Sequence, residues 1–162
     1  MMIRPAQEED LKTVLGFWNV VIRDTTISFS DEEKTLDSLR DMIIERRERG
    51  YEFLVAAGDK PVGLATYSQF RDGNNGYRHS MEHTIILAPE ARGHGVGRRL
   101  MHWLETHARV AGHHTMIAGV SGENEAGIAF HAALGYREIA RIPETGWKFN
   151  RWLDLVLMQK ML

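Results

Sequence analysis

Between a predicted strand, residues 81–87, and a predicted helix, the chain reads Arg92-Gly93-His94-Gly95-Val96-Gly97-Arg98-Arg99. Glycines let a backbone approach a bulky anion closely and turn its N–H groups towards it. The first turn of the helix adds unpaired N–H donors and the positive end of the helix dipole. The three arginines add charge-assisted donors. This turn therefore predicts a cradle for a phosphate or pyrophosphate group.

Two common phosphate-binding motifs fit this turn poorly. A P-loop needs a lysine and a hydroxyl residue after its glycines, whereas Gly97 is followed by Arg98 and Arg99. A dinucleotide-binding turn needs a third glycine where Arg98 stands. A glycine-rich turn that binds no ligand remains the alternative.

Apolar residues at helical spacing predict two helices near the start of the chain. The first follows a short strand near Ile3 and the acidic residues 8–10. The second has Asp31 as its predicted N-cap and ends at Gly50. Their apolar positions are Leu11, Val14, Leu15, Trp18, Val21 and Ile22 in the first helix, and Leu36, Leu39, Ile43 and Ile44 in the second.

Apolar runs separated by turn residues predict the strands and place the remaining helices. The strands cover residues 53–57, 62–67, 81–87, 115–120, 136–142 and 152–158, and the two later helices run from Val96 to Ala111 and from Asn124 to Gly135. The order β-α-α-β-β-β-α-β-α-β-β predicts one α/β (α+β) domain over residues 1–162. Its mixed sheet should carry helices on both faces.

Composition narrows the class of protein. The chain has 162 residues, 20 Lys and Arg against 22 Asp and Glu, 43% hydrophobic residues and no cysteine. The lack of cysteine excludes disulfides, a thiolate nucleophile and a cysteine zinc site. A net charge of −2 leaves no general cationic surface for nucleic acid. No apolar run approaches the length needed to span a membrane, and the N-terminus lacks the apolar core of a signal peptide, so we expect a cytoplasmic protein.

The spacing Arg92-x-x-Gly95-x-Gly97 resembles the acyl-CoA signature of the GNAT family of N-acetyltransferases. Further motifs are similar to the branch that contains the phosphinothricin and methionine sulfoximine N-acetyltransferases. They are Thr25-Thr26-Ile27-Ser28-Phe29, the run from Tyr77 to His83, the run from Val120 to Asn124, and the run from Gly146 to Asp154. The resemblance implies the GNAT fold, in which a mostly antiparallel central sheet has splayed strands.

The resemblance implies acetyl-CoA as the co-substrate and places it along three segments. The pyrophosphate would bind the loop and its flanking residues, which are Arg92, Gly93, His94, Gly95, Val96, Gly97 and Arg98. The pantetheine arm would follow the strand edge formed by Ile85, Ile86 and Leu87, where a backbone N–H would also stabilise the oxyanion. Asn124 would bond to the same arm from the next helix.

Two residues match the family's catalytic positions. Glu82 resembles the general base, and its alternative is a solvated carboxylate on an edge strand. His131 stands four residues before Gly135, where many members of the family carry the acid. It could protonate the departing thiolate or accept a proton from the amine, and its alternative is a packed histidine. Tyr136 is predicted to be a core residue rather than the acid.

Arg78 is the candidate clamp for an acceptor carboxylate, because a guanidinium matches two oxygens. Asn75, Gly76 and Tyr77 would wall the acceptor pocket, and an ordinary surface arginine is the alternative. A cluster of aromatic and basic residues near the C-terminus either packs or lies by the acceptor pocket and the contact between subunits of a homodimer. It consists of Trp147, Lys148, Phe149 and Trp152.

Other chemistries lack their residue patterns. His79 and His83 flank Glu82 in strand-like sequence, where they are too far apart to share one zinc ion, so no metal is expected. Ser121 lacks the glycine frame of a nucleophile elbow. We therefore predict direct transfer from acetyl-CoA to the α-amine of a small amino-acid-like acceptor such as phosphinothricin, methionine sulfoximine or methionine sulfone. The alternatives are a protein or peptide N-acetyltransferase and a non-catalytic acyl-CoA sensor.

Overall fold

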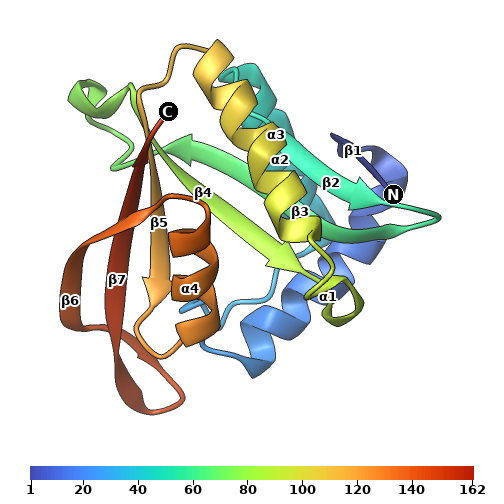
Figure 1. Cartoon of the computed structure of the whole chain (residues 1–162). Coiled ribbons are helices and arrows are strands. Elements are labelled where there is room, and N and C mark those ends of the chain that lie inside the picture. The colour runs from blue at the N-terminus through green and yellow to red at the C-terminus, as the bar shows by residue number, and fades with distance from the viewer.

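Seven strands form one sheet, and four α-helices cover it (Figure 1). The computed structural model describes all residues, 1–162. The strands are β1 (Met2–Pro5), β2 (Phe53–Ala57), β3 (Pro61–Gln69), β4 (Ser80–Leu87), β5 (Thr115–Ser121), β6 (Arg137–Lys148) and β7 (Arg151–Met161). The helices are α1 (Leu11–Asp24), α2 (Leu36–Glu48), α3 (Val96–Val110) and α4 (Glu125–Ala133), with short 3-10 turns η1 (Glu8–Asp10), η2 (Asn75–Tyr77) and η3 (Pro89–Ala91). The predicted fold class and element order are confirmed.

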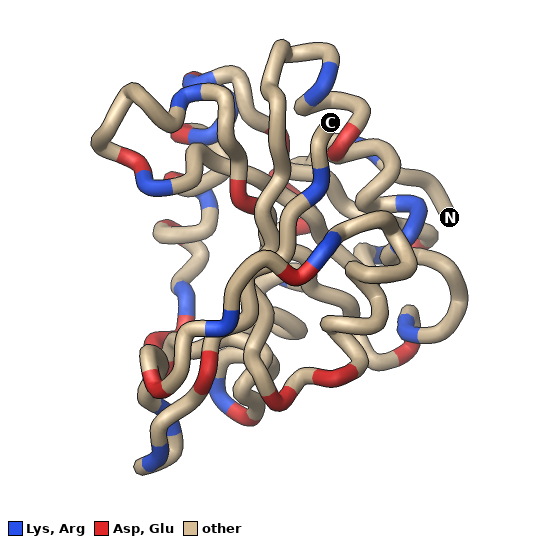
Figure 2. Tube along the Cα trace, turned by 60° about the vertical axis from the view of Figure 1, so that its left-hand side comes forward, with Lys and Arg blue, Asp and Glu red and all other residues tan.

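Alternating side chains of the sheet divide the core into two clusters. Phe53, Val55 and Ala57 of β2 pack with α1 and α2, whereas Leu54 and Ala56 belong to the cluster that contains the buried face of α3. This alternation follows from the two-residue period of a strand. The helices therefore cover both faces of the sheet, as predicted. Acidic and basic residues are interspersed along the trace (Figure 2).

The feature that positions the site is a fork between β4 and β5. The strand order is β1-β2-β3-β4-β5-β7-β6, and only the pair β4–β5 is parallel. That pair holds for three residues, from Ser80 opposite Thr115 to Glu82 opposite Ile117. The other edge of β4 stays paired with β3 as far as Leu87. From residue 83 onwards the edge of β4 that faces β5 has no strand partner, and the two strands diverge (Figure 1). The predicted splay is confirmed.

One predicted helix cap is wrong. The N-cap of α2 is Thr35 rather than Asp31. Thr35 Oγ1 accepts a hydrogen bond from Ser38 N at 3.1 Å, and Ser38 Oγ accepts one from Thr35 N at 2.9 Å. This reciprocal pair satisfies two backbone donors at once, which a single aspartate side chain does not do.

The last two strands are longer than predicted. They extend to Lys148 and start again at Arg151, so that only Phe149 and Asn150 form the turn. Both turn residues have positive φ angles, 52° and 58°, as a two-residue hairpin turn of the primed type requires. Phenylalanine seldom adopts this conformation, so the sequence carries no clear turn signal there.

Candidate active site

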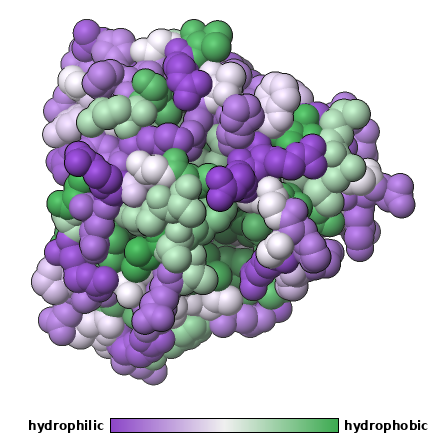
Figure 3. Space-filling view, in the orientation of Figure 1, coloured by the Kyte–Doolittle hydropathy of each residue, from purple (hydrophilic) through white to green (hydrophobic).

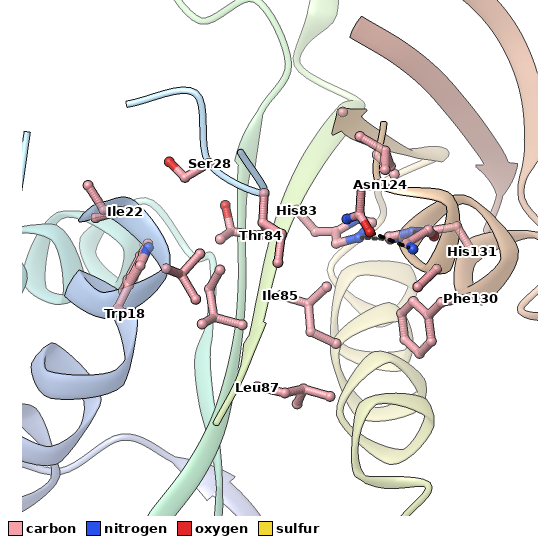
Figure 4. Close-up of a pocket in the computed structure, with 18 of the residues that line it drawn as sticks. Trp18, Ile22, Ser28, His83, Thr84, Ile85, Leu87, Asn124, Phe130 and His131 are labelled. Carbon is pink, nitrogen blue, oxygen red and sulfur yellow. Dashed lines mark hydrogen bonds between the residues drawn. The ribbon is translucent and has the colours of Figure 1, made fainter. Parts of the chain in front are cut away.

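A cleft of about 620 Å³ opens where β4 and β5 diverge. Its hydrophobic lining is visible on the face drawn in Figure 3, and Figure 4 shows its walls. The lining residues come from β4, the second half of β5, α1, the segment after α1, the glycine turn and α4. They are Trp18, Val21, Ile22, Ile27, Ser28, Ser30, Lys34, Glu82, His83, Thr84, Ile85, Ile86, Leu87, Arg92, Gly93, Ala118, Gly119, Val120, Asn124, Ala126, Gly127, Phe130 and His131.

The glycine turn presents unpaired backbone donors at one end of this cleft. Gly93 and Gly95 have φ angles of 76° and 75°, a left-handed conformation that favours glycine. The first hydrogen bond of α3 runs from Arg99 N to Gly95 O at 3.2 Å. None of the backbone amides of residues 93–98 donates a hydrogen bond to another protein group. These donors are therefore available to an anion.

The surroundings of the turn strengthen its positive potential. The side chains of Arg92 and Arg98 are exposed, and neither pairs with a carboxylate. A Cβ atom on Gly97 would lie 3.0 Å from the Phe130 ring, so glycine lets α3 start close against α4. An anion at this turn would meet the helix dipole and two uncompensated arginines.

Glu82 lies at the apex of the fork, because it is the last residue of β4 that pairs with β5. Its side chain is exposed to the cleft, and no protein group donates a hydrogen bond to its carboxylate or forms an ion pair with it. Loss of hydration between the cleft walls raises the pKa of Glu82 above its ordinary value. A carboxylate with these properties can accept a proton from an amine or from a water molecule beside it.

His131 of α4 is buried, and both of its ring nitrogens have partners. Its Nδ1 lies 2.7 Å from the carbonyl oxygen of Gly127, and its Nε2 lies 2.9 Å from Nε2 of His83 (Figure 4). Burial lowers the pKa of His131, and burial lowers the pKa of His83 to about 3. In the sequence His83 stood out only as a metal ligand, a role that its spacing from His79 excludes, and its contact with His131 was not predicted. The alternation of β4, which buries residues 81 and 83 together, is the signal that could have revealed it.

Tyr136 is a core residue, as predicted. Its hydroxyl donates a hydrogen bond to Glu105 Oε1 at 2.9 Å. Burial and the neighbouring Glu105 raise the pKa of this phenol. The ring itself packs against the two imidazoles, with centroids 5.6 Å from His83 and 5.3 Å from His131. Tyr136 therefore encloses the histidine pair but does not offer its proton to the cleft.

Asn124 lies in the cleft wall where α4 begins. Its Oδ1 accepts a hydrogen bond from Gly127 N at 2.9 Å and caps the helix. Its amide nitrogen has no protein partner, so it remains a donor for a ligand. Ile85, Ile86 and Leu87 also line the cleft. The residues predicted to contact a pantetheine arm therefore line one cavity.

The predicted acceptor-binding loop is not brought to this cleft. Asn75, Gly76 and Tyr77 form η2, at the opposite end of β4 from the open end of the fork (Figure 1). Arg78 Nη1 donates a hydrogen bond to the carbonyl oxygen of Asn75 at 3.0 Å, and none of the four residues lines the cleft. These residues were proposed because a guanidinium matches a carboxylate and because of the family resemblance, neither of which fixes where the loop lies. The extended β4 carries its two ends apart, so the loop at its start lies away from the open end of the fork.

The aromatic and basic cluster divides into two parts. Trp147, Phe149 and Trp152 are more than half exposed, at 51%, 52% and 58%. Lys148 is buried, and its ammonium donates hydrogen bonds to the carbonyl oxygens of Ile22 (2.5 Å), Thr25 (2.6 Å) and Ser28 (2.7 Å). Burial lowers the pKa of Lys148. None of these four residues lines the cleft. The hydrogen bonds of Lys148, however, hold the end of α1 and the segment after it, which do line the cleft.

Lys34 is the residue in the cleft wall that the sequence analysis missed. It is half-buried, and its ammonium lies 4.5 Å from the centroid of the Trp18 ring. No carboxylate forms an ion pair with it, and burial lowers its pKa. The signal was weak, because a single lysine in a charged run is normally solvated.

Two further features of the structure bear on ligands and membranes. No group of three or more His, Asp or Glu side chains is arranged to hold a metal ion. None of the helices combines the length and the apolar character that crossing a membrane demands.

Comparison with known proteins identifies the family. Residues 15–136 match the acetyltransferase (GNAT) family. The L-amino acid N-acyltransferase MnaT of Escherichia coli (strain K12) is 34% identical over 100% of this chain and 94% of its own length. The L-methionine sulfoximine/L-methionine sulfone acetyltransferase of Salmonella typhimurium is also 34% identical, over 100% of this chain and 95% of its own length.

Solved structures agree in fold over the whole chain. The ribosomal-protein-alanine N-acetyltransferase from Brucella melitensis superposes with a TM-score of 0.96, at 37% identity and 100% coverage of both chains. A phosphinothricin acetyltransferase from Sinorhizobium meliloti, solved in complex with acetyl-CoA, superposes with a TM-score of 0.94 at 29% identity. That superposition covers 99% of this chain and 88% of the neighbour. The chain belongs to the GNAT family and is an N-acetyltransferase.

Proposed function

We propose that this protein transfers the acetyl group of acetyl-CoA directly to the α-amine of a small amino-acid-like acceptor. The observation that carries the proposal is the β4–β5 fork. It has a free carboxylate, Glu82, at its apex and unpaired amides of residues 93–98 near its open end. A thioester with a pyrophosphate tail matches these three parts of the fork. Its pyrophosphate would bind the turn, its extended arm would lie along the strand edge, and its reactive carbonyl would lie at the apex.

The cofactor half of the proposal uses groups that protein atoms leave free. The amides of residues 93–98 and the guanidinium groups of Arg92 and Arg98 would bind the pyrophosphate. The edge of β4 from residue 83 to 87 has no strand partner, so the backbone groups that point into the fork would pair with the amides of the pantetheine arm. The free amide nitrogen of Asn124 would donate to the same arm from the opposite wall.

Transfer requires a free amine, an oxyanion partner and a leaving thiolate. Glu82 would take the proton of the acceptor ammonium, directly or through water. The amine nitrogen then attacks the thioester carbon, and a backbone N–H within residues 85–87 would stabilise the oxyanion. The nitrogen of the tetrahedral intermediate still carries a surplus proton. Collapse breaks the carbon–sulfur bond, and that proton is passed on to the departing thiolate of CoA, which leaves as the thiol. The chain has no cysteine to carry an acyl group, which favours direct transfer.

The acceptor would enter from the wall formed by α1 and the segment after it. Lys34 is the cation that lines this wall without an acidic partner, and we assign it the acceptor carboxylate. Arg78, the candidate from the sequence, does not line the cleft of its own chain. Relatives of similar length act on amino acids or on methionine sulfoximine and sulfone, as their names state. These names support an acceptor of that type, or of the phosphinothricin type.

The Brucella neighbour is named a ribosomal-protein-alanine N-acetyltransferase, which supports the alternative of a protein acceptor. Its identity of 37% makes this alternative worth a direct test. A half-buried lysine suits a free carboxylate, whereas the first residue of a protein has none at that position. The wall around Lys34 therefore favours a free amino acid.

A homodimer in the cytoplasm completes the proposal. The exposed rings of Trp147 and Trp152 stack across the β6–β7 hairpin with centroids 4.6 Å apart. Such an exposed aromatic patch favours contact with another chain. Acetyl-CoA, the proposed co-substrate, is an intracellular metabolite.

The test is a thiol-release assay with the purified protein and acetyl-CoA. The amines are the common amino acids, methionine sulfoximine, methionine sulfone, phosphinothricin and a peptide with an N-terminal alanine. We expect amine-dependent release of CoA with the sulfoximine, sulfone or phosphinothricin compounds and little with the peptide. Preference for the peptide would establish the alternative. Binding of acetyl-CoA in calorimetry without turnover of any amine would indicate a sensor.

A further inference from the structure

Two imidazoles lie side by side where β4 meets α4. His83 and His131 are 7% and 6% exposed, and their ring centroids are 5.0 Å apart. Phe130 packs edge to face against His131 (Figure 4). Tyr136 packs edge to face against both His131 and His83. The two rings also border the cleft, and the backbone of Ile117 lies beside His83. Their closest hydrogen-bond partners are each other and the Gly127 carbonyl.

The pattern of acceptors determines where the hydrogens are. The carbonyl of Gly127 can only accept, so Nδ1 of His131 carries the hydrogen of that 2.7 Å contact. A neutral imidazole has one N–H, which leaves Nε2 of His131 as a bare lone pair. His83 must therefore donate its own Nε2–H across the 2.9 Å contact. Burial lowers the pKa of both rings, which keeps them neutral near pH 7.

The remaining nitrogen of the pair agrees with this assignment. Nδ1 of His83 is buried and has no hydrogen-bond partner. A lone pair there leaves the single hydrogen of His83 on Nε2, where the 2.9 Å contact with His131 requires it. The hydrogen bonds thus run in one direction, from His83 to His131 and from His131 to Gly127.

We propose that His83 is a positioning residue for the acetyl transfer, which holds His131 in one ring orientation and as the Nδ1–H tautomer. This inference rests on the proposed function. It also decides between the two roles that the sequence leaves open for His131. A neutral ring whose only hydrogen is bound to Gly127 has none to give to a thiolate. After Glu82 has taken the first proton of the ammonium, His131 would accept at Nε2 the second, which the nitrogen of the tetrahedral intermediate loses, once His83 releases Nε2 of His131.

Replacement of His83 separates positioning from packing. In His83→Leu the lone pair of His131 Nε2 loses its donor, so the ring can flip or exchange tautomers. In His83→Gln the side-chain amide can donate from nearly the same place. The matched control is His107→Leu, which breaks the 2.8 Å contact between His107 Nδ1 and the hydroxyl of Tyr67 outside the cleft.

The experiment combines nitrogen-15 NMR of the histidine rings with steady-state kinetics. At neutral pH we expect His131 as the Nδ1–H tautomer and His83 as the Nε2–H tautomer in the unaltered protein. In His83→Leu we expect mixed tautomers for His131, with kcat reduced about tenfold or more and the KM for acetyl-CoA within about twofold. In His83→Gln we expect the single tautomer and most of kcat to return. His107→Leu should leave the His131 spectrum and kcat unchanged.

Several results would overturn the proposal. They are an Nε2–H tautomer of His131 in the unaltered protein, an unchanged His131 spectrum in His83→Leu, and full kcat in that variant. If His83→Leu does not fold, the spectrum of the unaltered protein and the activity of His83→Gln still decide. The spectra do not need turnover, so a protein without acetyltransferase activity would refute the proposed function while the tautomer assignment is judged separately.

Discussion

The two ends of the cleft are built in different ways. The end assigned to the cofactor is a contiguous stretch, residues 92–98, whose shape follows from its glycines and from the start of α3. The wall assigned to the acceptor is formed by α1 and residues 27–34, and Lys148 fastens it from positions 120 to 126 residues away in the chain. The first end depends on local backbone geometry. The second depends on a long-range contact that appears only in the folded chain.

This difference predicts which substitutions weaken the binding of acetyl-CoA and which weaken the binding of the acceptor. A defect in the turn should weaken acetyl-CoA binding and leave the acceptor unaffected. A defect in the Lys148 contact should do the reverse and also cost stability, because it leaves buried carbonyl groups without a donor. Glu82, at the apex where the two ends meet, should affect the reaction itself.

The largest effect is expected at this apex. Glu82→Gln removes the proton acceptor and keeps the shape, so kcat should fall about 100-fold or more, as general-base catalysis contributes. The KM for acetyl-CoA should change little, as thiol-release kinetics would reveal. The control is Glu90→Gln in η3, an exposed glutamate outside the cleft, which should have no effect. Equal activity of both variants would remove Glu82 from the mechanism.

Lys148→Met tests the long-range fastening of the acceptor wall. Three carbonyl oxygens lose their charged donor, so the free energy of unfolding should fall by about 3 kcal/mol in urea titrations. The KM for the acceptor should rise more than the KM for acetyl-CoA. Lys60→Met, at an exposed turn, is the control and should change neither quantity. An unchanged free energy of unfolding in Lys148→Met would show that the segment after α1 keeps its conformation without the lysine.

The pH profile tests the state of the carboxylate at the apex. Loss of hydration between the cleft walls raises the pKa of Glu82 above its ordinary value, and a base acts only when deprotonated. With the amine saturating, kcat should therefore be lost as pH falls through the raised pKa, about tenfold for each pH unit below it. Glu82→Gln should lack this limb. If the limb persists in that variant, it belongs to another group.

Replacement of the two candidate cations distinguishes a site within one chain from a site shared between two. Lys34→Met should raise the KM for the amino acid about tenfold, the value of one charge-assisted hydrogen bond, and Lys34→Arg should retain most of the affinity. Arg78→Ala should leave that KM unchanged. The opposite pattern would mean that the loop of residues 75–78 of a second copy completes the acceptor site.

The smallest effect is expected from a single methyl group at the cofactor end. Gly95→Ala forces a side chain into a left-handed conformation at a cost of about 1 kcal/mol, so the KM for acetyl-CoA should rise about fivefold. Thermal unfolding should shift down by a few degrees. Gly16→Ala is the control, and it should change stability in the opposite direction. Gly16 lies in α1, where an added Cβ would meet no atom within 4 Å, so alanine should stabilise the protein slightly.

Much of the fold was accessible from the sequence because its signals are local. The stripe from Val96 to Ala111 and the alternation in residues 53–57 reflect the periods of helix and strand. The errors fell where a tertiary or unusual local contact replaced the common signal. Thr35 gained its capping role from a reciprocal bond with Ser38, and the hairpin of β6 and β7 turns at Phe149, a residue that rarely does so.

The candidate site divides in the same way. The residues assigned to acetyl-CoA lie on consecutive segments, and the structure brings them to one cleft. Asn75 to Arg78 were proposed from side-chain chemistry and the family resemblance, and the extended β4 carries them away from that cleft. Lys34 and His83 were missed, because their importance lies in what they contact rather than in their sequence context.

The sequence by itself determined the family, the order of elements and the anion-binding turn, since each depends on residues within a few positions of one another. Only the tertiary structure decided that β4 and β5 part after Glu82, that two histidines 48 residues apart share one hydrogen bond, and that Lys148 fastens the opposite wall. These contacts join distant segments. Their geometry comes from the packing of the whole sheet and its helices, which no local pattern of side chains encodes.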